Sequence, residues 1–317
     1  MVMLNRAIHS ALKDCLKVRQ EEMVLILADT PLSELGYQFY KAAKSLSNRP
    51  LLLILPEITN HRTEPPKSVA SVMADADAIV TLTSHSLSHT NARRRASHRG
   101  ARIASLPGVT PETLSRTLTG NYKNLINKSR KLADILTIAR SAHLTTPAGT
   151  DLTFSLTRMR GFADTGMIHE PGQFSNLPAG EGCASPVQGS THGVLVVDGS
   201  FTEIGKIKTP IRMTVKNNHV IRITGSEEAN KLRKLLRPFG KLGRNIAEIG
   251  IGTNPKAKLT GCTLEDEKVL GTVHVALGDN ISFGGKVSAG CHFDGVLLKP
   301  TLIIDGKAIL ENGTLQV

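Results

Sequence analysis

The residues best suited to chemistry lie close together in the second half of the chain, between residues 246 and 295. The segments IAEIGIGTN, LEDEKVLGTVHVALGDN and GGKVSAGCHFDG place acidic residues and histidines within short apolar runs: Glu248, Asp266, Glu267, His274, His292 and Asp294. Carboxylates and imidazoles are costly to bury in apolar surroundings unless a partner compensates them. A divalent metal ion would compensate several such groups at once, so we expect a metal site here.

The spacing of these residues supports a shared site. His292 and Asp294 are two positions apart in CHFDG, and a strand would place both side chains on one face. His274 lies in a second strand-like segment, TVHVALG, and Glu248 precedes the glycine-containing IGIGTN. Glu181 ends the Pro/Gly loop FSNLPAGE. Two histidines and three carboxylates suit Zn, Co, Mn or Fe(II), and do not suit soft Cu(I).

Length and composition indicate a globular protein of two domains. The chain has 317 residues, more than one domain usually contains, and 40% of them are hydrophobic. No apolar run approaches the roughly 18 residues that a membrane span needs, and we expect a cytoplasmic protein without a membrane partner. The cysteines are widely spaced and form no Cys-x-x-Cys motif, which is typical of a reducing compartment: Cys15, Cys183, Cys262 and Cys291.

The formal net charge of +12 raises the question of nucleic-acid binding. A protein that binds single strands usually combines basic residues with aromatic platforms, and this chain has no Trp and only three Tyr. The densest basic cluster, residues 92–102, follows the polar face of an expected helix. We therefore interpret it as a solvated face, or one that attracts anionic substrates, and expect no specific nucleic-acid partner.

The first part of the chain alternates between two patterns. Apolar runs predict buried parallel strands at residues 21–29, 49–57, 77–84 and 101–108, and amphipathic segments predict helices at 4–18, 33–46, 64–76 and 90–100. This alternation predicts a doubly wound α/β domain of the Rossmann or flavodoxin type over residues 1–125. The loop after the first strand reads ADTPLSELG and lacks the G-x-G-x-x-G fingerprint, which argues against a dinucleotide.

Two histidines, His85 and His89, follow the third expected strand, at the end where open α/β sheets place their ligands. One interpretation is that Ser88 or Thr90 caps the next helix and leaves the imidazoles exposed. The other is that the histidines face an active-site cavity.

The second part of the chain has a different texture. A helical pattern at residues 122–142 would link the domains. Short β-type segments then alternate with Gly, Asn-Asn, Asp-Gly and Asn-Gly turns, with one clear helix at residues 226–240. We expect an α+β, mostly antiparallel domain over residues 126–317 that carries the metal site.

Several motifs resemble one family as a set. NLPAGE, E-x-G-I-G-T-N, DEK followed by GTVHVALGDN, CHFDG and the upstream PAGTDLTFSL are similar to the metalloaminopeptidases typified by aminopeptidases T and S and related leucyl aminopeptidases. The resemblance covers most of the chain. It implies a homodimeric hydrolase that removes N-terminal residues from peptides.

The resemblance also implies roles for individual residues. Two divalent cations (Zn, Co or Mn) would be held per chain, with Glu248 as the bridging carboxylate and Glu267 as the general acid/base: the ligands are Glu181, Glu248, His274, His292 and Asp294. Such a metal pair activates a bridging hydroxide and polarises the scissile carbonyl, while a free carboxylate moves the proton to the leaving amine.

Departures from this family keep other interpretations open. The spacing between DEK and His274 is longer, the spacing between the histidines is shorter, and the tyrosine expected between them is missing, with residues 280–283 in its place. The same broad superfamily includes a ring-opening dihydroxypyridine dioxygenase with one Fe(II) held by two histidines and one carboxylate. His274, His292 and Asp294 would form that triad, and Glu181 and Glu248 would not bind metal. A third interpretation is a basic, non-enzymatic binding protein whose acid and histidine cluster is structural.

Overall fold

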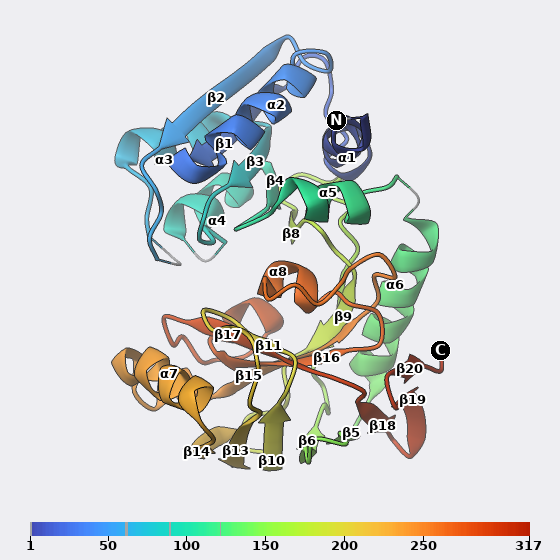
Figure 1. Ribbon diagram of the computed structural model, residues 1–317. Coiled ribbons are helices and arrows are strands. Elements are labelled where there is room, and N and C mark those ends of the chain that lie inside the picture. The colour runs from blue at the N-terminus through green and yellow to red at the C-terminus, as the bar shows by residue number, and fades with distance from the viewer. Residues whose placement is uncertain (1, 61–62, 89, 121) are drawn as a thin grey trace. The chain divides into compact units, whose positions relative to one another are not determined.

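The computed structural model describes residues 2–60, 63–88, 90–120 and 122–317. The chain divides into two compact units (Figure 1): residues 1–122 with 166–179, and residues 123–165 with 180–317. The sequence placed one boundary after residue 125 and assigned everything that follows to the second domain. That assignment is wrong for residues 166–179, because they add a strand to the sheet of the first unit.

The first unit is built on a parallel sheet in the order β2-β1-β3-β4-β8, as the alternation of strands and helices predicts. Its strands are β1 (Met23–Asp29), β2 (Arg49–Leu55), β3 (Ala78–Leu82), β4 (Arg102–Ser105) and β8 (Phe174–Asn176). The first strand is buried over almost its whole length, which explains its continuous apolar run. Strand β8 was not predicted, because its three residues, FSN, carry no apolar run.

Helices connect the parallel strands of this unit. They are α1 (Val2–Ser10), the π-helical turn η1 (Ala11–Cys15), the 3-10 turn η2 (Thr30–Leu32), α2 (Ser33–Ala43), α3 (Lys67–Asp75), α4 (Asn91–His98) and α5 (Pro111–Thr117). Helix α4 carries the basic cluster and begins with the predicted cap, since Thr90 Oγ1 accepts a hydrogen bond from the Arg93 backbone N–H at 3.1 Å.

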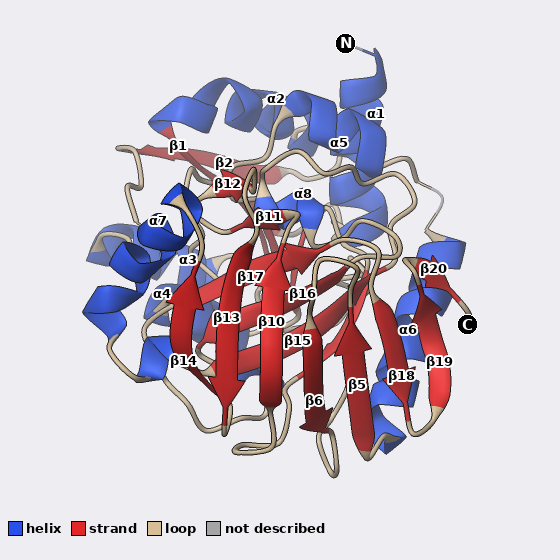
Figure 2. Ribbon diagram, turned by 60° about the horizontal axis from the view of Figure 1, so that its bottom comes forward, coloured by secondary structure: helices blue, strands red, loops and turns tan. Residues whose placement is uncertain are grey.

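The second unit contains two antiparallel sheets, and Figure 2 labels most of their strands. One has the order β14-β13-β10-β6-β5-β18-β19-β20: β5 (Ser141–Thr145), β6 (Asp151–Ser155), β10 (His192–Val197), β13 (Ile211–Lys216), β14 (His219–Thr224), β18 (Thr301–Ile304), β19 (Lys307–Glu311) and β20 (Thr314–Leu315). The other has the order β12-β11-β17-β16-β15-β9-β7: β7 (Phe162–Asp164), β9 (Glu181–Ala184), β11 (Ser200–Phe201), β12 (Gly205–Lys206), β15 (Ile246–Gly252), β16 (Val273–Gly278) and β17 (His292–Leu297).

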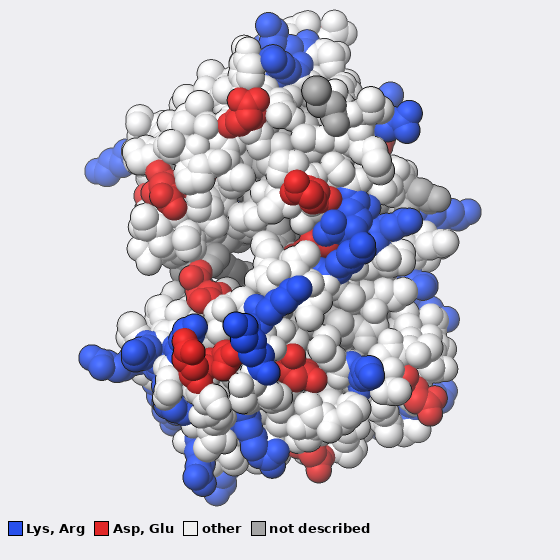
Figure 3. All heavy atoms as spheres, in the orientation of Figure 1, with Lys and Arg blue, Asp and Glu red and all other residues white. Residues whose placement is uncertain are grey.

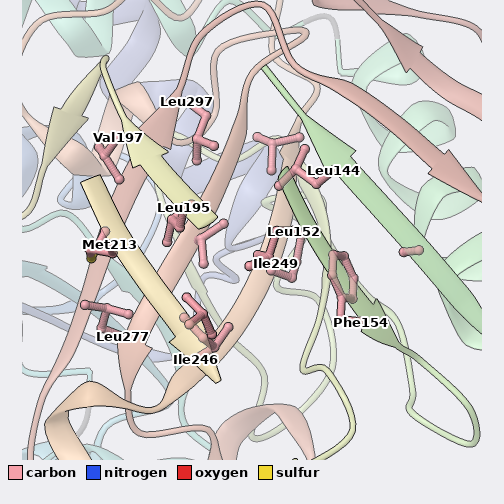
Figure 4. Close-up of a cluster of buried hydrophobic side chains, with 14 of the residues drawn as sticks. Leu144, Leu152, Phe154, Leu195, Val197, Met213, Ile246, Ile249, Leu277 and Leu297 are labelled. Atoms are coloured by element: carbon pink, nitrogen blue, oxygen red, sulfur yellow. The ribbon is translucent and has the colours of Figure 1, made fainter. Parts of the chain in front are cut away.

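The two sheets of this unit share a hydrophobic core (Figure 4). Leu152, Leu195 and Met213 of the first sheet pack in one buried cluster with Ile249 and Leu277 of the second. Side chains alternate along a strand. The residues that alternate with Ile249 on β15 and with Leu277 on β16 therefore point to the opposite face of the second sheet. That face carries the polar residues described below.

Helices and short 3-10 turns complete the second unit: α6 (Lys123–Ile138), α7 (Glu227–Leu236), η3 (Arg237–Phe239), η4 (Leu242–Arg244), α8 (Thr263–Asp266) and η5 (Ile281–Phe283). Helix α6 packs against β7 and β9 of its own unit. The sequence predicted a helix as far as residue 142. The helix ends at Ile138 instead, because residues 141–145 pair with β6 and β18 as strand β5.

Charged residues are dispersed over the surface. On the face shown in Figure 3, Lys and Arg lie in several separate groups with Asp and Glu between them. Among the described residues, no helix combines the length and the apolar character that crossing a membrane requires.

Candidate metal centre

The candidate site lies on one face of four neighbouring strands, β9, β15, β16 and β17, which run side by side in Figure 1. The strand register explains why. Ala276 of β16 pairs with Glu248 on one side and with Asp294 on the other, so the small alanine separates the two carboxylates. His274 lies two residues before Ala276 on β16, and His292 lies two residues before Asp294 on β17. The two-residue period therefore brings all four side chains to the same face.

Glycine at position 250 makes room for one of the imidazoles. Gly250 pairs directly with His274. A Cβ atom added at Gly250 would lie 2.2 Å from both Cε1 and Nε2 of the His274 ring. Gly250, the first glycine of the E-x-G-I-G-T-N motif, thus leaves the space that this imidazole occupies, which we call the Gly250 cradle.

The imidazole and carboxylate groups converge closely. His292 Nε2 lies 3.0 Å from Glu248 Oε2 and 3.4 Å from Asp294 Oδ1. His274 Nε2 lies 3.3 Å from Glu181 Oε2 and 3.7 Å from Glu248 Oε1. The five residues proposed as metal ligands from the sequence are therefore brought together, although they come from four different strands.

Two contacts other than those to the carboxylates fix the orientation of His292. Its Nδ1 donates to the carbonyl oxygen of Asp279 at 2.8 Å, and its ring stacks on Phe283 with centroids 5.6 Å apart. This arrangement directs Nε2 towards the carboxylates, as an outer partner does for a metal-binding histidine. His274 Nδ1, by contrast, is buried and has no hydrogen-bond partner among the residues that the structure describes.

The proximity of these imidazoles and carboxylates shifts their pKa values. Burial lowers the pKa of His274, but Glu248 and Glu181 outweigh it and raise the pKa to about 9. Burial alone would raise the pKa of Glu248, yet the two imidazoles hold it below its usual range. The groups compensate one another's charge, as a buried set of this kind must.

A buried lysine, which the sequence analysis did not single out, adjoins the cluster. Lys268 is only 1% exposed, and its Nζ lies 2.7 Å from Glu181 Oε1, 2.8 Å from Glu267 Oε1 and 3.3 Å from Asp164 Oδ2. These carboxylates raise its pKa well above the usual value, against the effect of burial. Lys268 thus holds one oxygen of Glu181 and leaves the other, Oε2, directed at His274.

The two acids of the DEK segment have different surroundings. Burial, reinforced by Asp294, raises the pKa of Glu267 to about 8 despite the attraction of Lys268. Asp266 does not belong to the cluster, because its oxygens accept hydrogen bonds from the backbone N–H groups of Thr260 and Gly261. It anchors a loop.

Three sets of side chains in the described residues have ligand atoms within 4.8 Å of one another. They are Glu248 with His292 and Asp294; Glu267 with His274 and Asp294; and Glu181 with Cys183 and Glu248. Asp294 belongs to both sets that contain a histidine. The donor set fits a divalent metal ion of the borderline type.

Comparison with known proteins identifies the family. A family model described as 2,5-dihydroxypyridine 5,6-dioxygenase (NicX) matches residues 3–317. The chain belongs to this family. A curated 2,5-dihydroxypyridine 5,6-dioxygenase of Pseudomonas putida KT2440 is 29% identical over 223 residues, which cover 64% of this chain and 61% of that protein. The match therefore spans less than two thirds of the relative's length.

Two solved structures resemble this NicX-family chain. The 2,5-dihydroxypyridine dioxygenase of Pseudomonas putida KT2440 superposes with a TM-score of 0.83 and 22% identity, over 98% of this chain and 96% of that one. Aminopeptidase AmpT of Thermus thermophilus superposes with a TM-score of 0.72 and 14% identity, over 99% of each chain. At these identities the likeness establishes the shared fold alone.

Family membership corrects the main functional prediction. The metalloaminopeptidase assignment, and with it the class of hydrolase, is wrong, because the NicX model matches almost the whole chain. The resemblance to aminopeptidase T reflects the common fold. The dioxygenase named as the second interpretation is the one that the family supports.

The structure describes one of the two histidines, His85 and His89, that follow the third parallel strand. His85 Nδ1 donates to the carbonyl oxygen of Ile58 at 2.7 Å, within the first unit. His89 lies outside the described residues. A role for either in a cavity stays a prediction.

Proposed function

We propose that this protein is a ring-opening dioxygenase that acts on 2,5-dihydroxypyridine or a close dihydroxylated analogue, with one Fe(II) per chain. The observation that carries the proposal is that Asp294 shares one set of converging ligand atoms with His292 and another with His274, in a member of the NicX family. Two histidines and one carboxylate are the ligand set typical of non-haem Fe(II) oxygenases. The proposal replaces the pair of Zn, Co or Mn ions expected from the aminopeptidase resemblance.

The residues that would hold the iron are His274 and His292 through Nε2 and Asp294 through a carboxylate oxygen. Three observations support the fit: Nε2 of His292 faces Asp294, the Gly250 cradle accommodates the His274 ring, and Asp294 is common to both histidine-containing sets. When bound, Fe(II) supplies the redox chemistry that allows dioxygen to react with the ring. Glu248 and Glu181 then flank the ion without binding it.

Glu267 is the residue we assign to proton transfer. Lys268 fixes its Oε1 at 2.8 Å, so Oε2 is the oxygen left to exchange a proton with a ring hydroxyl. Lys268 itself remains a positioning residue, because its ammonium is already surrounded by carboxylates. The substrate would be oriented by its hydroxyl groups.

The test is oxygen uptake by the Fe(II)-reconstituted protein on addition of 2,5-dihydroxypyridine, followed together with loss of the substrate's ultraviolet absorption. Stoichiometric uptake of dioxygen is the expected result. Hydroquinone, whose two hydroxyl groups are also para to each other, serves as the ring that lacks the nitrogen. Iron bound at one per chain with turnover of neither compound would contradict the substrate class.

Variants separate the triad from its neighbours. Asp294→Asn should weaken iron binding by more than about tenfold, which is the low end of what even an outer partner contributes. Glu181→Gln should retain one iron per chain, because Glu181 lies outside the proposed triad. Equal loss of iron in both variants would show that the ligand set is wrong. A homodimer, expected from the sequence, stays a prediction that sedimentation of the purified protein can check.

A further inference from the structure

A thiol lies beside the metal centre, on the same face of the sheet. Cys183 is two residues after Glu181 on β9 and pairs with Gly250 of β15, two residues from Glu248. Both periodicities place Cys183 on the face that carries Glu181 and Glu248. The sulfur and one oxygen from each carboxylate lie within 4.8 Å of one another, and all three residues are buried.

One oxygen of this set accepts no hydrogen bond. Glu181 is 8% exposed, and its Oε1 is paired with Lys268. Its Oε2 is buried and accepts no hydrogen bond from the described residues, although His274 Nε2 lies 3.3 Å away. A buried carboxylate oxygen without a donor is costly, so it marks a position where a cation or a donor group would be stabilised.

We propose that Glu181, Cys183 and Glu248 form a second cation site, which takes thiophilic divalent ions such as Zn²⁺ or Cd²⁺. A thiolate with two carboxylates suits these ions, whereas Mg²⁺ and Ca²⁺ prefer oxygen ligands alone. On binding, the S–H bond of Cys183 breaks, the sulfur–metal bond forms and the proton passes to solvent. No electron is transferred.

Occupancy of this thiolate site would affect the histidines. Glu248 Oε2 lies 3.0 Å from His292 Nε2, and Glu181 Oε2 lies 3.3 Å from His274 Nε2. A cation that binds these carboxylates draws them away from both imidazoles. Zn²⁺ or Cd²⁺ should therefore inhibit the enzyme. This consequence rests on the proposed function, but the thiolate site itself does not.

The experiment is a Cd²⁺ titration of the full chain, followed by the ultraviolet charge-transfer absorption of the cadmium–thiolate bond. Cys262 is partly exposed, so Cys262→Ser provides the background in which it cannot contribute. We expect the band to appear in Cys262→Ser and to be lost on adding Cys183→Ser, with the affinity for Cd²⁺ lowered by more than about tenfold. A band that persists in the double variant, or is absent from the background protein, would overturn the proposal.

A second measurement needs no change at the site. X-ray absorption of Cd²⁺-loaded Cys262→Ser protein should show one sulfur neighbour together with oxygen neighbours. Oxygen and nitrogen neighbours alone would refute the thiolate site even if Cys183→Ser failed to fold. Both readouts are made without iron or substrate, so failure of the dioxygenase proposal would leave them unchanged.

Discussion

A single methyl group should be enough to disable the metal centre. In Gly250→Ala, the new Cβ would lie 2.2 Å from the His274 ring, so the imidazole or the strand must shift. We expect overpacking to cost about 1–3 kcal/mol of stability and iron to be lost from most chains. Metal content by elemental mass spectrometry and the unfolding free energy in urea together check the prediction.

Gly306→Ala is the matched control for Gly250→Ala. Gly306 has a φ of 80° and no atom within 4 Å of an added Cβ, so the substitution strains the backbone without touching the site. We expect it to destabilise the protein by about 1 kcal/mol and to leave the iron in place. Full iron content in Gly250→Ala would show that the cradle is not needed.

The ammonium of Lys268 should be more important to stability than any single carboxylate around it. Lys268→Met leaves the buried Glu181 and Glu267, and the partly buried Asp164, without their shared cation. Removing one partner of a buried ion pair typically costs about 3–5 kcal/mol. Urea unfolding should show a loss of this size, with part of it recovered in Lys268→Arg. A loss below about 1 kcal/mol, the value of a surface pair, would mean that the carboxylates find other partners.

Residue types and strand periodicity were enough to find the acids and histidines of the site. His292 and Asp294 could be paired from their spacing alone, because a strand fixes the side-chain direction every second residue. Lys268 and Cys183 could not be found in this way. Lys268 contacts residues of β7 and β9, and Cys183 lies on β9 beside β15, and the register of these strands is not written in local sequence. Histidine and carboxylate donors suit several metal-dependent reactions, so they could not distinguish the dioxygenase from the aminopeptidase.

At the scale of elements, the loop before α8 depends on one buried carboxylate. Asp266 Oδ1 accepts hydrogen bonds from the backbone N–H and the hydroxyl of Thr260, and Oδ2 accepts one from the Gly261 N–H. Asp266→Ala would leave these donors unsatisfied, and we expect a loss of about 1–3 kcal/mol or more in urea unfolding. Because Glu267 and Lys268 follow directly, activity should fall as well.

Asp266→Asn distinguishes the hydrogen bonds of Asp266 from its charge. The amide keeps one acceptor oxygen, so its stability should lie between those of the wild type and Asp266→Ala. Wild-type stability in the alanine variant would mean that the loop does not need this anchor.

Elements with a strong period were predicted well, and short ones were not. The apolar run of β1 and the amphipathic pattern of α2 are long enough to specify a buried strand and a helix. Strand β8 has only three residues and forms because β4 offers it a parallel edge. The start of strand β5 shows the opposite error, since residues 141 and 142 were included in the predicted helix but belong to a strand that pairs with β6 and β18. Tertiary pairing decides such segments.

At the scale of the whole molecule, the return of residues 166–179 to the first unit was the feature least accessible to sequence. The pairing of Ile103 with Phe174 joins positions 71 residues apart, the difference between 174 and 103. No local composition marks this crossing, because both flanking segments consist of short β-type runs and turns. A domain boundary drawn as a single point therefore misplaces one strand.

Iron binding should stabilise the second unit selectively, since all of the proposed ligands belong to it. A ligand that binds only the native state adds about 2.7 kcal/mol when its free concentration is a hundred times Kd. Hydrogen exchange of iron-loaded and chelator-treated protein should therefore show increased protection in β15, β16 and β17 and little change in β1 and β3. Asp294→Asn should show no such difference, because it lacks the ligand common to both histidine-containing sets. Protection that rises equally in β1 and β3 would mean that the two units unfold together, and unchanged protection in β17 would exclude iron from this face of the sheet.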